Sequence, residues 1–339
     1  MTGWKSKWSR NRDVLHGDWG VDTSVDAART SACATKKALM LSSVLTIGNF
    51  DGVHAGHRQL LRRVLELARE HHLKPAVLTF DPHPTRVVAP ERTPRLLTTI
   101  EERIALIREQ GVEEVVVLPF TPEVARLSPE EFVEQIVAGQ LHARIVMVGD
   151  NFRFGYKQSG DVKTLSALGE RFAFQTHIVD AVHRRGRVVS SSEIRRLIEE
   201  GNVAMAARLL ERPYALSGEV VSGHGIGSKQ TVSTLNLKTP AEVIPANGVY
   251  ITRTRDLETH ERWNSITNVG NRPTFDGDSL TIETFLLSSF DGLTPGRIAV
   301  QLCRRLRDER KFETAEALKQ QIFHDVARAQ AFFRRLGLH

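Results

Sequence analysis

Residues 48–57 read Gly48-Asn-Phe-Asp-Gly-Val-His-Ala-Gly-His57, and they set the character of the first half of the chain. An apolar run at 44–50 leads into this motif and a helical pattern at 56–71 follows, so the motif is predicted to join a strand to a helix. At such a junction in an α/β sheet, ligands bind at the strand's carboxyl end and the helix N-terminus offers free N–H groups to phosphate. We therefore expect His54 and His57 to face one anionic group; for isolated histidines, the alternative is a solvated pair.

Strands and helices alternate on from this motif. A capping box at 128–131, with Pro129 at the first helical position, predicts a helix that ends near residue 141. Another helix is expected at 100–110, and further strands are expected at 75–80, 114–120, 144–148 and 175–179. Strands that alternate with helices form a parallel sheet covered on both faces. We therefore predict an α/β, Rossmann-like domain with a parallel sheet over residues 41–185.

The pattern changes after residue 185. A helical pair is expected at 191–200 and 203–211, so residues 186–212 are predicted to be a helical connection. Beyond Pro213, turn residues separate short apolar segments that are expected to be strands, at 214–221, 249–255, 265–269, 279–287 and 297–302. This spacing is typical of an antiparallel β-barrel. A periodic segment at 314–335 predicts a C-terminal helix, and the second domain is predicted to cover residues 213–339.

Residues 1–40 differ from the rest of the chain in their sequence pattern. Trp4, Trp8 and Trp19 are scattered among polar residues, without the periodicity of a strand or a helix. We expect a mostly disordered N-terminal extension, in which several aspartates argue against a transit peptide. Met40 lies just before the first predicted strand, so the sequence leaves open whether the protein begins at Met1 or near Met40.

Composition excludes several classes of protein. The chain has 339 residues, of which 46 are basic and 40 acidic, so the formal net charge is +6. This favours anionic partners, but it lacks the dense basic tract of a nucleic-acid-binding arm. Two cysteines, Cys33 and Cys303, exclude a disulfide framework and a cysteine-based zinc site. Because no signal peptide and no apolar run of about 18 residues is present, we expect a cytoplasmic protein that neither spans a membrane nor is secreted.

The motif at 48–57 resembles the signature of the HxGH nucleotidyltransferases. Companion segments resemble one branch of them, the bacterial bifunctional riboflavin kinase/FAD synthetases, and lie at 78–84, 117–121, 148–155, 160–161 and 189–195. The resemblance runs from about residue 44 to 335, which is almost everything outside the N-terminal stretch. An HxGH motif alone is weak, whereas this combination is specific.

The resemblance implies roles for residues of the first domain. An adenylate pocket is expected at Gly48, Asn49, Phe50 and Asp51, and His54 and His57 are expected to bind the ATP phosphates as catalytic residues. Asn151 is expected to help hold nucleotide and metal. A serine-rich loop with Ser190, Ser191 and Arg195 is expected to grip the departing pyrophosphate; taken alone, these residues also fit a plain serine N-cap with a surface arginine. His83 supports the family without being assigned a catalytic role.

The barrel carries a second set of candidates. Thr234 and Asn236 lie two apart in an extended segment, so both face one side, and their oxygens suit Mg²⁺ bound with phosphates. The resemblance implies a nucleotide loop at Gly223, Gly225 and Gly227, a catalytic base at Glu283, and flavin-side loops at Arg272 and Arg307. Without such neighbours, Glu283 is read as an exposed strand carboxylate. Ser233, Leu235 and Ile226 depart from the family's usual Pro, Ala and Arg, which puts loop rigidity and nucleotide binding in doubt.

The resemblance implies two reactions. The barrel phosphorylates riboflavin with ATP to FMN, and the α/β domain adenylylates FMN with ATP to FAD and pyrophosphate, both with Mg²⁺. One alternative is an FMN adenylyltransferase whose barrel only binds flavin; the other is a nucleic-acid-binding protein, which the few aromatic residues of the barrel disfavour. The discriminating observation is whether Thr234, Asn236 and Glu283 come together. The sequence gives no expectation of the oligomeric state.

Overall fold

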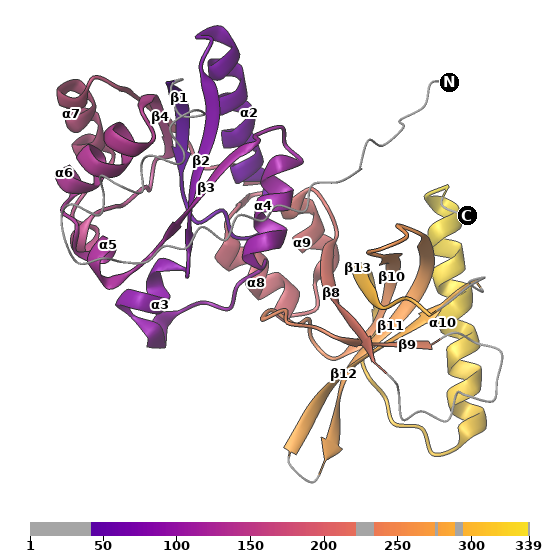
Figure 1. The fold of residues 1–339 in the computed structure, drawn as a ribbon. Helices are drawn as coiled ribbons and strands as arrows, with labels where there is room; N and C mark the ends of the chain where they lie inside the picture. Colours follow the sequence, from indigo (N-terminus) through magenta and orange to yellow (C-terminus); the bar gives the residue numbers. More distant parts are fainter. Residues whose placement is uncertain (1–41, 222–233, 275–276, 289–293, 338–339) are drawn as a thin grey trace. The chain divides into compact units, whose positions relative to one another are not determined.

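A parallel sheet organises the first half of the described chain. The structure is a computed structural model, and it describes residues 42–221, 234–274, 277–288 and 294–337, without the side chains of 272–274 and 277–279. The five strands are β1 (Ser43–Ile47), β2 (Lys74–Asp81), β3 (Glu114–Pro119), β4 (Ala143–Gly149) and β5 (Gln175–Val179). Their order is β3-β2-β1-β4-β5, all parallel (Figure 1). Because the chain proceeds outward from β1 in both directions, the carboxyl end of β1 is a topological switch point, where ligands bind in such sheets.

Helices cover both faces of this sheet, as predicted. One face packs against α2 (Ala55–Glu70) and α4 (Ile100–Arg108) in a core that includes Leu61, Ile107 and Met147. The other face packs against α6 (Pro129–Phe132), η3 (Val133–Gln140) and α7 (Val162–Phe172). The short elements α3 (Pro84–Val88), η2 (Pro90–Arg92), α5 (Pro122–Arg126) and η4 (Tyr156–Gln158) lie in the connections.

Two details of these helices differ from the sequence-based prediction. The helix that begins at the Ser128 capping box continues as a π-helix, η3, so that the Leu141 N–H donates to the Ile136 carbonyl at 2.9 Å. Helix α7 was not predicted, because Gly169 interrupts its pattern. A Cβ at Gly169 would meet the Phe174 carbonyl oxygen at 2.7 Å, so the close return of the chain requires glycine there.

The connection contains a hairpin followed by the predicted helical pair. The hairpin consists of β6 (His183–Arg184) and β7 (Arg187–Val188), and Arg185 and Gly186 form its turn at positive φ. The two helices are α8 (Ser191–Glu199) and α9 (Val203–Leu210). Ser190 caps α8 and Asn202 caps α9, each by accepting a backbone N–H from the third helical residue.

The second half is a closed barrel of order β10-β11-β12-β9-β8-β13, which confirms the predicted fold class (Figure 1). Its strands are β8 (Tyr214–Val221), β9 (Thr234–Lys238), β10 (Gly248–Asp256), β11 (Arg262–Thr274), β12 (Gly277–Leu286) and β13 (Arg297–Arg307). All the neighbouring strands pair antiparallel. The predicted C-terminal helix, α10 (Ala315–Arg335), packs Ala329 and Phe333 against the outer faces of β10 and β11.

The barrel interior has an apolar part and a hydroxyl part. Leu216, Leu235 and Val300 belong to the apolar core. On β10, β11 and β12, five buried hydroxyls form a chain of side-chain hydrogen bonds of 2.8–2.9 Å, in the order Thr254, Ser265, Thr252, Thr267 and Thr284. We call this chain the hydroxyl ladder. Because side chains alternate along a strand, an inward Thr284 places its neighbour Glu283 on the outer face of the barrel.

Candidate active sites

The chain makes a strained turn directly after β1. Phe50 (φ 50°), Gly52 (φ 79°) and Val53 (φ 38°) all have left-handed backbone conformations. For a β-branched residue such as Val53 this conformation is an outlier, and such strain persists only where surrounding contacts fix the backbone. We therefore expect contacts from other parts of the fold to fix the backbone of this turn.

Side-chain hydrogen bonds hold the turn from two sides. Arg212, just beyond α9, donates from Nη2 to the Gly52 carbonyl at 2.7 Å and from Nη1 to the Val53 carbonyl at 3.2 Å. The Thr98 hydroxyl accepts the Gly52 N–H at 3.2 Å. Burial lowers the pKa of Arg212 to about 10, which leaves it charged at neutral pH.

Asp51 anchors the same turn with its carboxylate. Only 2% of Asp51 is exposed, and its carboxylate accepts the backbone N–H groups of Leu97 and Thr98 at 2.9–3.1 Å. It also forms an ion pair of 3.0 Å with Arg195. The Asp51 carboxylate is thus engaged within the protein, and the lining of a nucleotide pocket by Asp51 stays a prediction.

His54 and His57 lie together at the start of α2. His54 is the N-cap, and its Nδ1 accepts the His57 backbone N–H at 3.3 Å, so the neutral ring carries its proton on Nε2. The two rings stack with centroids 3.6 Å apart and planes inclined by 12°. The Nδ1 of His57 is buried and has no hydrogen-bond partner. Two imidazoles from one turn therefore face the carboxyl edge of the sheet side by side.

Burial keeps both rings neutral. Loss of solvation lowers the pKa of His54 to about 4, an effect that the nearby Asp51 charge only partly opposes. Burial also lowers the pKa of His57 well below its usual range, and the neighbouring His54, Arg103 and Arg212 act in the same direction. At neutral pH, both residues are hydrogen-bond donors or acceptors and carry no charge.

The other predicted residues of this site lie at strand ends. Gly48 and Asn49 follow β1; the Gly48 N–H donates to the Leu78 carbonyl, and the Asn49 carbonyl accepts the Thr79 hydroxyl at 3.2 Å. Phe50 is buried in the core under α2, with its ring 5.0 Å from that of His57. Asn151 is exposed in the turn after β4, with its Oδ1 beside Gly149. The predicted residues thus follow the two central strands, β1 and β4.

The serine-rich loop meets the turn at the start of α8. The Ser191 hydroxyl donates to the Asp51 carbonyl at 2.9 Å, and Ser190 caps the helix by accepting the Glu193 N–H at 3.2 Å. Arg195 contacts both the Asp51 carboxylate and the Ser192 hydroxyl, and its Nε is buried without a partner. These contacts place Ser190, Ser191 and Arg195 beside the turn that carries His54.

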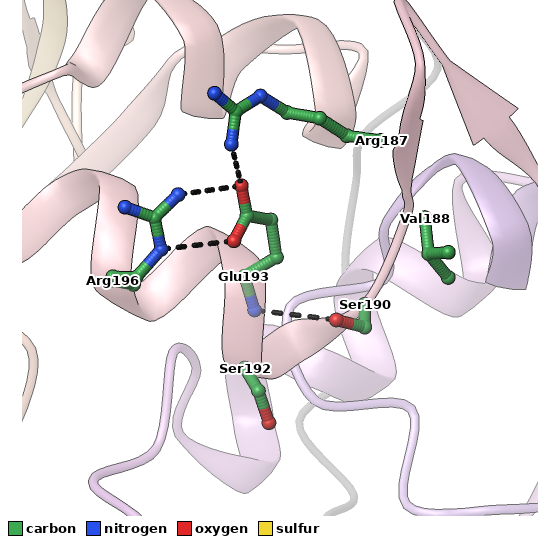
Figure 2. Close-up of a pocket in the computed structure, with 6 residues that line it drawn as sticks. All are labelled: Arg187, Val188, Ser190, Ser192, Glu193 and Arg196. Atoms are coloured by element: carbon green, nitrogen blue, oxygen red, sulfur yellow. Dashed lines mark hydrogen bonds and ion pairs between the residues drawn. The ribbon is translucent and has the colours of Figure 1, made fainter.

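A pocket opens next to this loop (Figure 2). Its lining residues come from β7, the loop and α8: Arg187, Val188, Ser190, Ser192, Glu193 and Arg196. The Glu193 carboxylate lies between two guanidinium groups, 2.6 Å from Arg187 and 2.8 Å from Arg196. Hydrogen bonds from Arg196 and Arg187 lower the pKa of Glu193. The pocket therefore has a basic rim whose charge is partly balanced by one carboxylate.

The barrel brings its predicted residues together on one outer face. Strands β9 and β12 pair antiparallel, with Asn236 directly opposite Glu283 and Thr234 directly opposite Phe285. Leu235 and Leu237 point into the barrel core, so the residues between and beside them, Asn236 and Thr234, face outward. The register thus makes Glu283 and Asn236 cross-strand neighbours, with Thr234 two residues away on the same face of β9, and their roles as base and metal ligands stay predictions.

The structure describes only some of the remaining residues that were predicted for the barrel site. Gly223, Gly225 and Gly227, with the departures Ile226 and Ser233, lie outside the described residues, as does the side chain of Arg272. Arg307 lies at the end of β13, where its Nε donates to the buried Asp325 of α10 at 2.9 Å. Arg307 therefore ties the barrel to the C-terminal helix in this structure, and its covering of an active site stays a prediction.

Sequence reasoning missed two arginines at the first site. Arg212 follows α9 and precedes Pro213, where no periodic pattern singles it out. Arg103 does have a signal, because it occupies an apolar-face position of α4 between Ile100 and Ile107. Only 2% of Arg103 is exposed.

Two classes of feature are absent from the part of the chain that the structure describes. No helix there is long and apolar enough to cross a membrane. The same residues contain no group of three or more His, Cys, Asp or Glu side chains arranged to hold a metal ion.

Family models match both halves of the chain. Residues 36–193 match the FAD synthetase model and residues 210–333 match the riboflavin kinase model. Among curated proteins, the chain is 34% identical to the bifunctional riboflavin kinase/FMN adenylyltransferase of Escherichia coli K12, over 86% of this chain and 92% of that protein. It is 33% identical to the protein of the same name from Haemophilus influenzae, over 85% and 94%.

A solved structure has the same fold. The crystal structure described as a macrolide-efflux protein from Streptococcus pneumoniae matches with a TM-score of 0.77 and 27% identity. The match covers 85% of this chain and 94% of that one. The shared architecture therefore includes both the α/β domain and the barrel.

Proposed function

The chain belongs to the bifunctional riboflavin kinase/FMN adenylyltransferase family, and we propose that each of its two folded regions carries one of the two reactions. The barrel, residues 213–339, transfers the γ-phosphate of ATP to riboflavin and forms FMN. The α/β domain, residues 41–185, joins FMN to the adenylyl group of a second ATP, so that FAD forms and pyrophosphate leaves. The observation that carries the proposal is the presence of two separate sets of groups, a histidine pair after β1 and an Asn–Glu pair across β9 and β12.

At the first site, the neutral histidines act on the α-phosphate of ATP. A phosphate oxygen of FMN attacks this phosphorus, and negative charge grows on the non-bridging oxygens as the bond to pyrophosphate breaks. The Nε2–H of His54 and the N-terminus of α2 donate hydrogen bonds to that charge. Because burial holds the pKa of both rings far below the ordinary histidine value, His54 and His57 are poor bases, and they stabilise charge without taking a proton from the attacking phosphate.

The serine-rich loop serves the leaving group. Ser190 and Ser191 stand at the N-terminus of α8, and the Nε of Arg195 is a donor that no protein group uses. Hydroxyls, a helix N-terminus and a guanidinium together form an anion site. Asp51 contributes indirectly, since it holds Arg195 and the turn in place.

At the second site, Glu283 is the proposed base for riboflavin. A carboxylate positioned beside the primary ribityl hydroxyl orients it and accepts its proton as the oxygen attacks the γ-phosphate. Thr234 and Asn236 offer oxygen donors on the face that Glu283 shares, which is the ligand type that Mg²⁺ prefers. Bound there with the ATP phosphates, Mg²⁺ would neutralise their charge.

We further propose a cytoplasmic location, supported by the two-cysteine composition.

The histidine assignment is tested with a double variant. In His54→Ala/His57→Ala, the conversion of FMN to FAD is expected to fall by roughly 100-fold or more, since two transition-state donors are removed. Riboflavin phosphorylation by the same preparation is expected to remain within about twofold of wild type. The matched control is His71→Ala/His72→Ala, an exposed pair at the other end of α2, which is expected to leave both reactions unchanged. Equal FAD formation by both double variants would refute the assignment.

The base assignment is tested with Glu283→Gln. This change keeps the shape of the side chain and removes its basicity, so kcat for riboflavin phosphorylation is expected to fall by roughly 100-fold or more. FAD formation from supplied FMN is expected to be unchanged. Glu261→Gln, an exposed residue on the same barrel, is the control. A Glu283→Gln enzyme with the wild-type kinase kcat would show that another group is the base.

A further inference from the structure

Arg103 is a buried cation that feels the charges of Asp51 and Asp81 but forms no ion pair with any carboxylate of the described residues. Only 2% of the residue is exposed, yet within the described chain no carboxylate lies close enough to form an ion pair with it. Its guanidinium has five N–H donors, and the one hydrogen bond it makes is long, from Nη1 to the Phe80 carbonyl at 3.4 Å. Its Nε is buried without any partner. An unpaired buried charge is costly, so a partner for this group is expected in the working enzyme.

The position of Arg103 indicates where that partner comes from. It extends from α4 to the carbonyl of Phe80, near the carboxyl end of β2, and β2 is the strand next to β1. Its charge is felt by His57, by His83 and by Asp51, which belong to the loops after β1 and β2. Arg103 therefore lies at the carboxyl edge of the sheet, beside the histidine that we assign to the ATP phosphates.

Neighbouring groups do not meet the needs of Arg103. The Asp51 carboxylate already accepts the Leu97 and Thr98 N–H groups and pairs with Arg195. Arg212, the other arginine missed by sequence reasoning, has its donors engaged by the Gly52 and Val53 carbonyls. The two arginines are thus different in kind: Arg212 supports the backbone of the turn, whereas Arg103 feels the charges of Asp51 and Asp81 but has donors that no group of the described residues uses.

We propose that Arg103 is a substrate-binding residue, whose guanidinium pairs with a phosphate group during adenylyl transfer. The proposal rests on FAD formation at this edge of the sheet. Both substrates carry the required chemistry, ATP in its polyphosphate and FMN in its phosphate monoester. A guanidinium binds phosphate through two parallel N–H···O bonds, which fits a residue that has several free donors.

The test uses Arg103→Met, with Arg108→Met as its control. Methionine fills the space without charge, and Arg108 is an exposed residue on the same helix. In Arg103→Met, kcat/KM for FAD formation from FMN and ATP is expected to fall by about 10- to 100-fold, the effect of losing a hydrogen-bonded charged partner. A rise in the KM for ATP assigns the contact to the polyphosphate, and a rise in the KM for FMN assigns it to the monoester. Riboflavin phosphorylation by the same chain is expected to stay within about twofold of wild type.

The Tm of the ligand-free variant separates a substrate-binding arginine from a merely structural one, because the loss of a structural arginine would lower the Tm. Replacing a buried charge that forms no ion pair by an apolar side chain is neutral or stabilising, so the Tm of ligand-free Arg103→Met is expected to equal or exceed that of wild type. Inorganic pyrophosphate, added as a probe, is expected to raise the Tm of wild type and Arg108→Met more than that of Arg103→Met if the partner is the polyphosphate.

Several results would overturn the proposal. One is unchanged kinetics for both substrates in a folded Arg103→Met enzyme. Another is a variant that does not fold, or whose Tm and two activities fall together, because the fold itself would then require the guanidinium. Wild-type enzyme that forms no FAD from FMN and ATP would instead contradict the proposed function, so the two failures are distinguishable.

Discussion

Single residues at the first site are tuned by burial more than by charge. His54 is 7% exposed and lies close to Asp51, a neighbour that favours a protonated ring. Loss of solvation nevertheless dominates and lowers the pKa of His54 to about 4. The Asp51 charge has a limited effect because Arg195 and backbone N–H groups already neutralise it. In the proposed function, this balance makes His54 a neutral hydrogen-bond donor to the α-phosphate.

The neutral state of His54 predicts a pH dependence of stability. The pKa of His54 is about 4 in the folded protein and 6.5 for an unperturbed histidine, so between these values the unfolded chain binds a proton that the folded chain does not. His54 therefore leaves stability unaffected above about pH 6.5 and lowers the free energy of unfolding as the pH falls toward 4, by up to about 3 kcal/mol. The His54→Asn variant keeps a good N-cap and cannot titrate, so its free energy of unfolding is expected to fall less over this range.

Urea unfolding at several pH values between 4.5 and 7.5 measures this difference. His324→Gln, which removes an exposed histidine of α10, is expected to follow wild type. Parallel curves for wild type and His54→Asn would contradict the neutral assignment, since a histidine with an ordinary pKa in the folded state contributes no such slope.

Among the elements, the barrel contains buried hydroxyl groups that hydrogen-bond to one another across three strands. Thr267 lies in the middle of the hydroxyl ladder and bonds to both Thr252 and Thr284, whereas Thr254 lies at its end and bonds only to Ser265. Removing the Thr267 hydroxyl takes from the buried Thr284 its partner in the ladder, at about 1–3 kcal/mol, whereas Ser265 still bonds to Thr252 when the Thr254 hydroxyl is removed. Thr267→Val is therefore expected to lower the free energy of unfolding of the barrel by about 2 kcal/mol more than Thr254→Val.

Denaturant unfolding of the three variants Thr267→Val, Thr254→Val and Thr294→Val tests the ladder. Thr294 is exposed and belongs to no helix or strand, so its substitution is expected to have little effect. Equal losses at Thr267 and Thr254 would mean that the ladder does not stabilise the barrel as a connected chain.

Elements with a strong period were predictable, and those fixed by distant contacts were not. Apolar runs that alternate with helical patterns predicted the strands from β1 to β5, and the Ser128 capping box predicted the start of α6. Strand β9 was predicted only as an extended segment that places Thr234 and Asn236 on one side; its pairing with β8 and β12 is a property of the fold. The left-handed Val53 has no local signal at all, since Arg212, 159 residues later, holds its carbonyl.

The candidate sites divide in the same way. His54 and His57 were predicted from a local motif, whereas Glu283 was predicted from the family resemblance together with Thr234 and Asn236. The engagement of the Asp51 carboxylate with Leu97, Thr98 and Arg195 depends on three segments that meet only in the fold. A sequence pattern names residue types at a strand end, but it does not show which of them already have partners within the protein.

At the scale of the whole molecule, one chain holds two sites that use phosphate chemistry differently. In the proposed function, the first site offers neutral histidines and arginines to phosphate groups, and the second offers a carboxylate and oxygen donors to a hydroxyl and a metal–nucleotide complex. FMN is the product of one and the substrate of the other. Variants at separate sites are therefore expected to be independent, because they share no contacts.

The most direct measurement mixes the two site variants. Glu283→Gln and His54→Ala/His57→Ala are each incubated with riboflavin, ATP and Mg²⁺, alone and together, and FMN and FAD are separated by chromatography. We expect riboflavin to remain unreacted with Glu283→Gln and FMN to accumulate with the histidine variant. The mixture is expected to form FAD after a lag, as FMN made by one protein reaches the other. A mixture that stops at FMN, or a histidine variant that forms FAD alone, would contradict the assignment of the two reactions to these two sites.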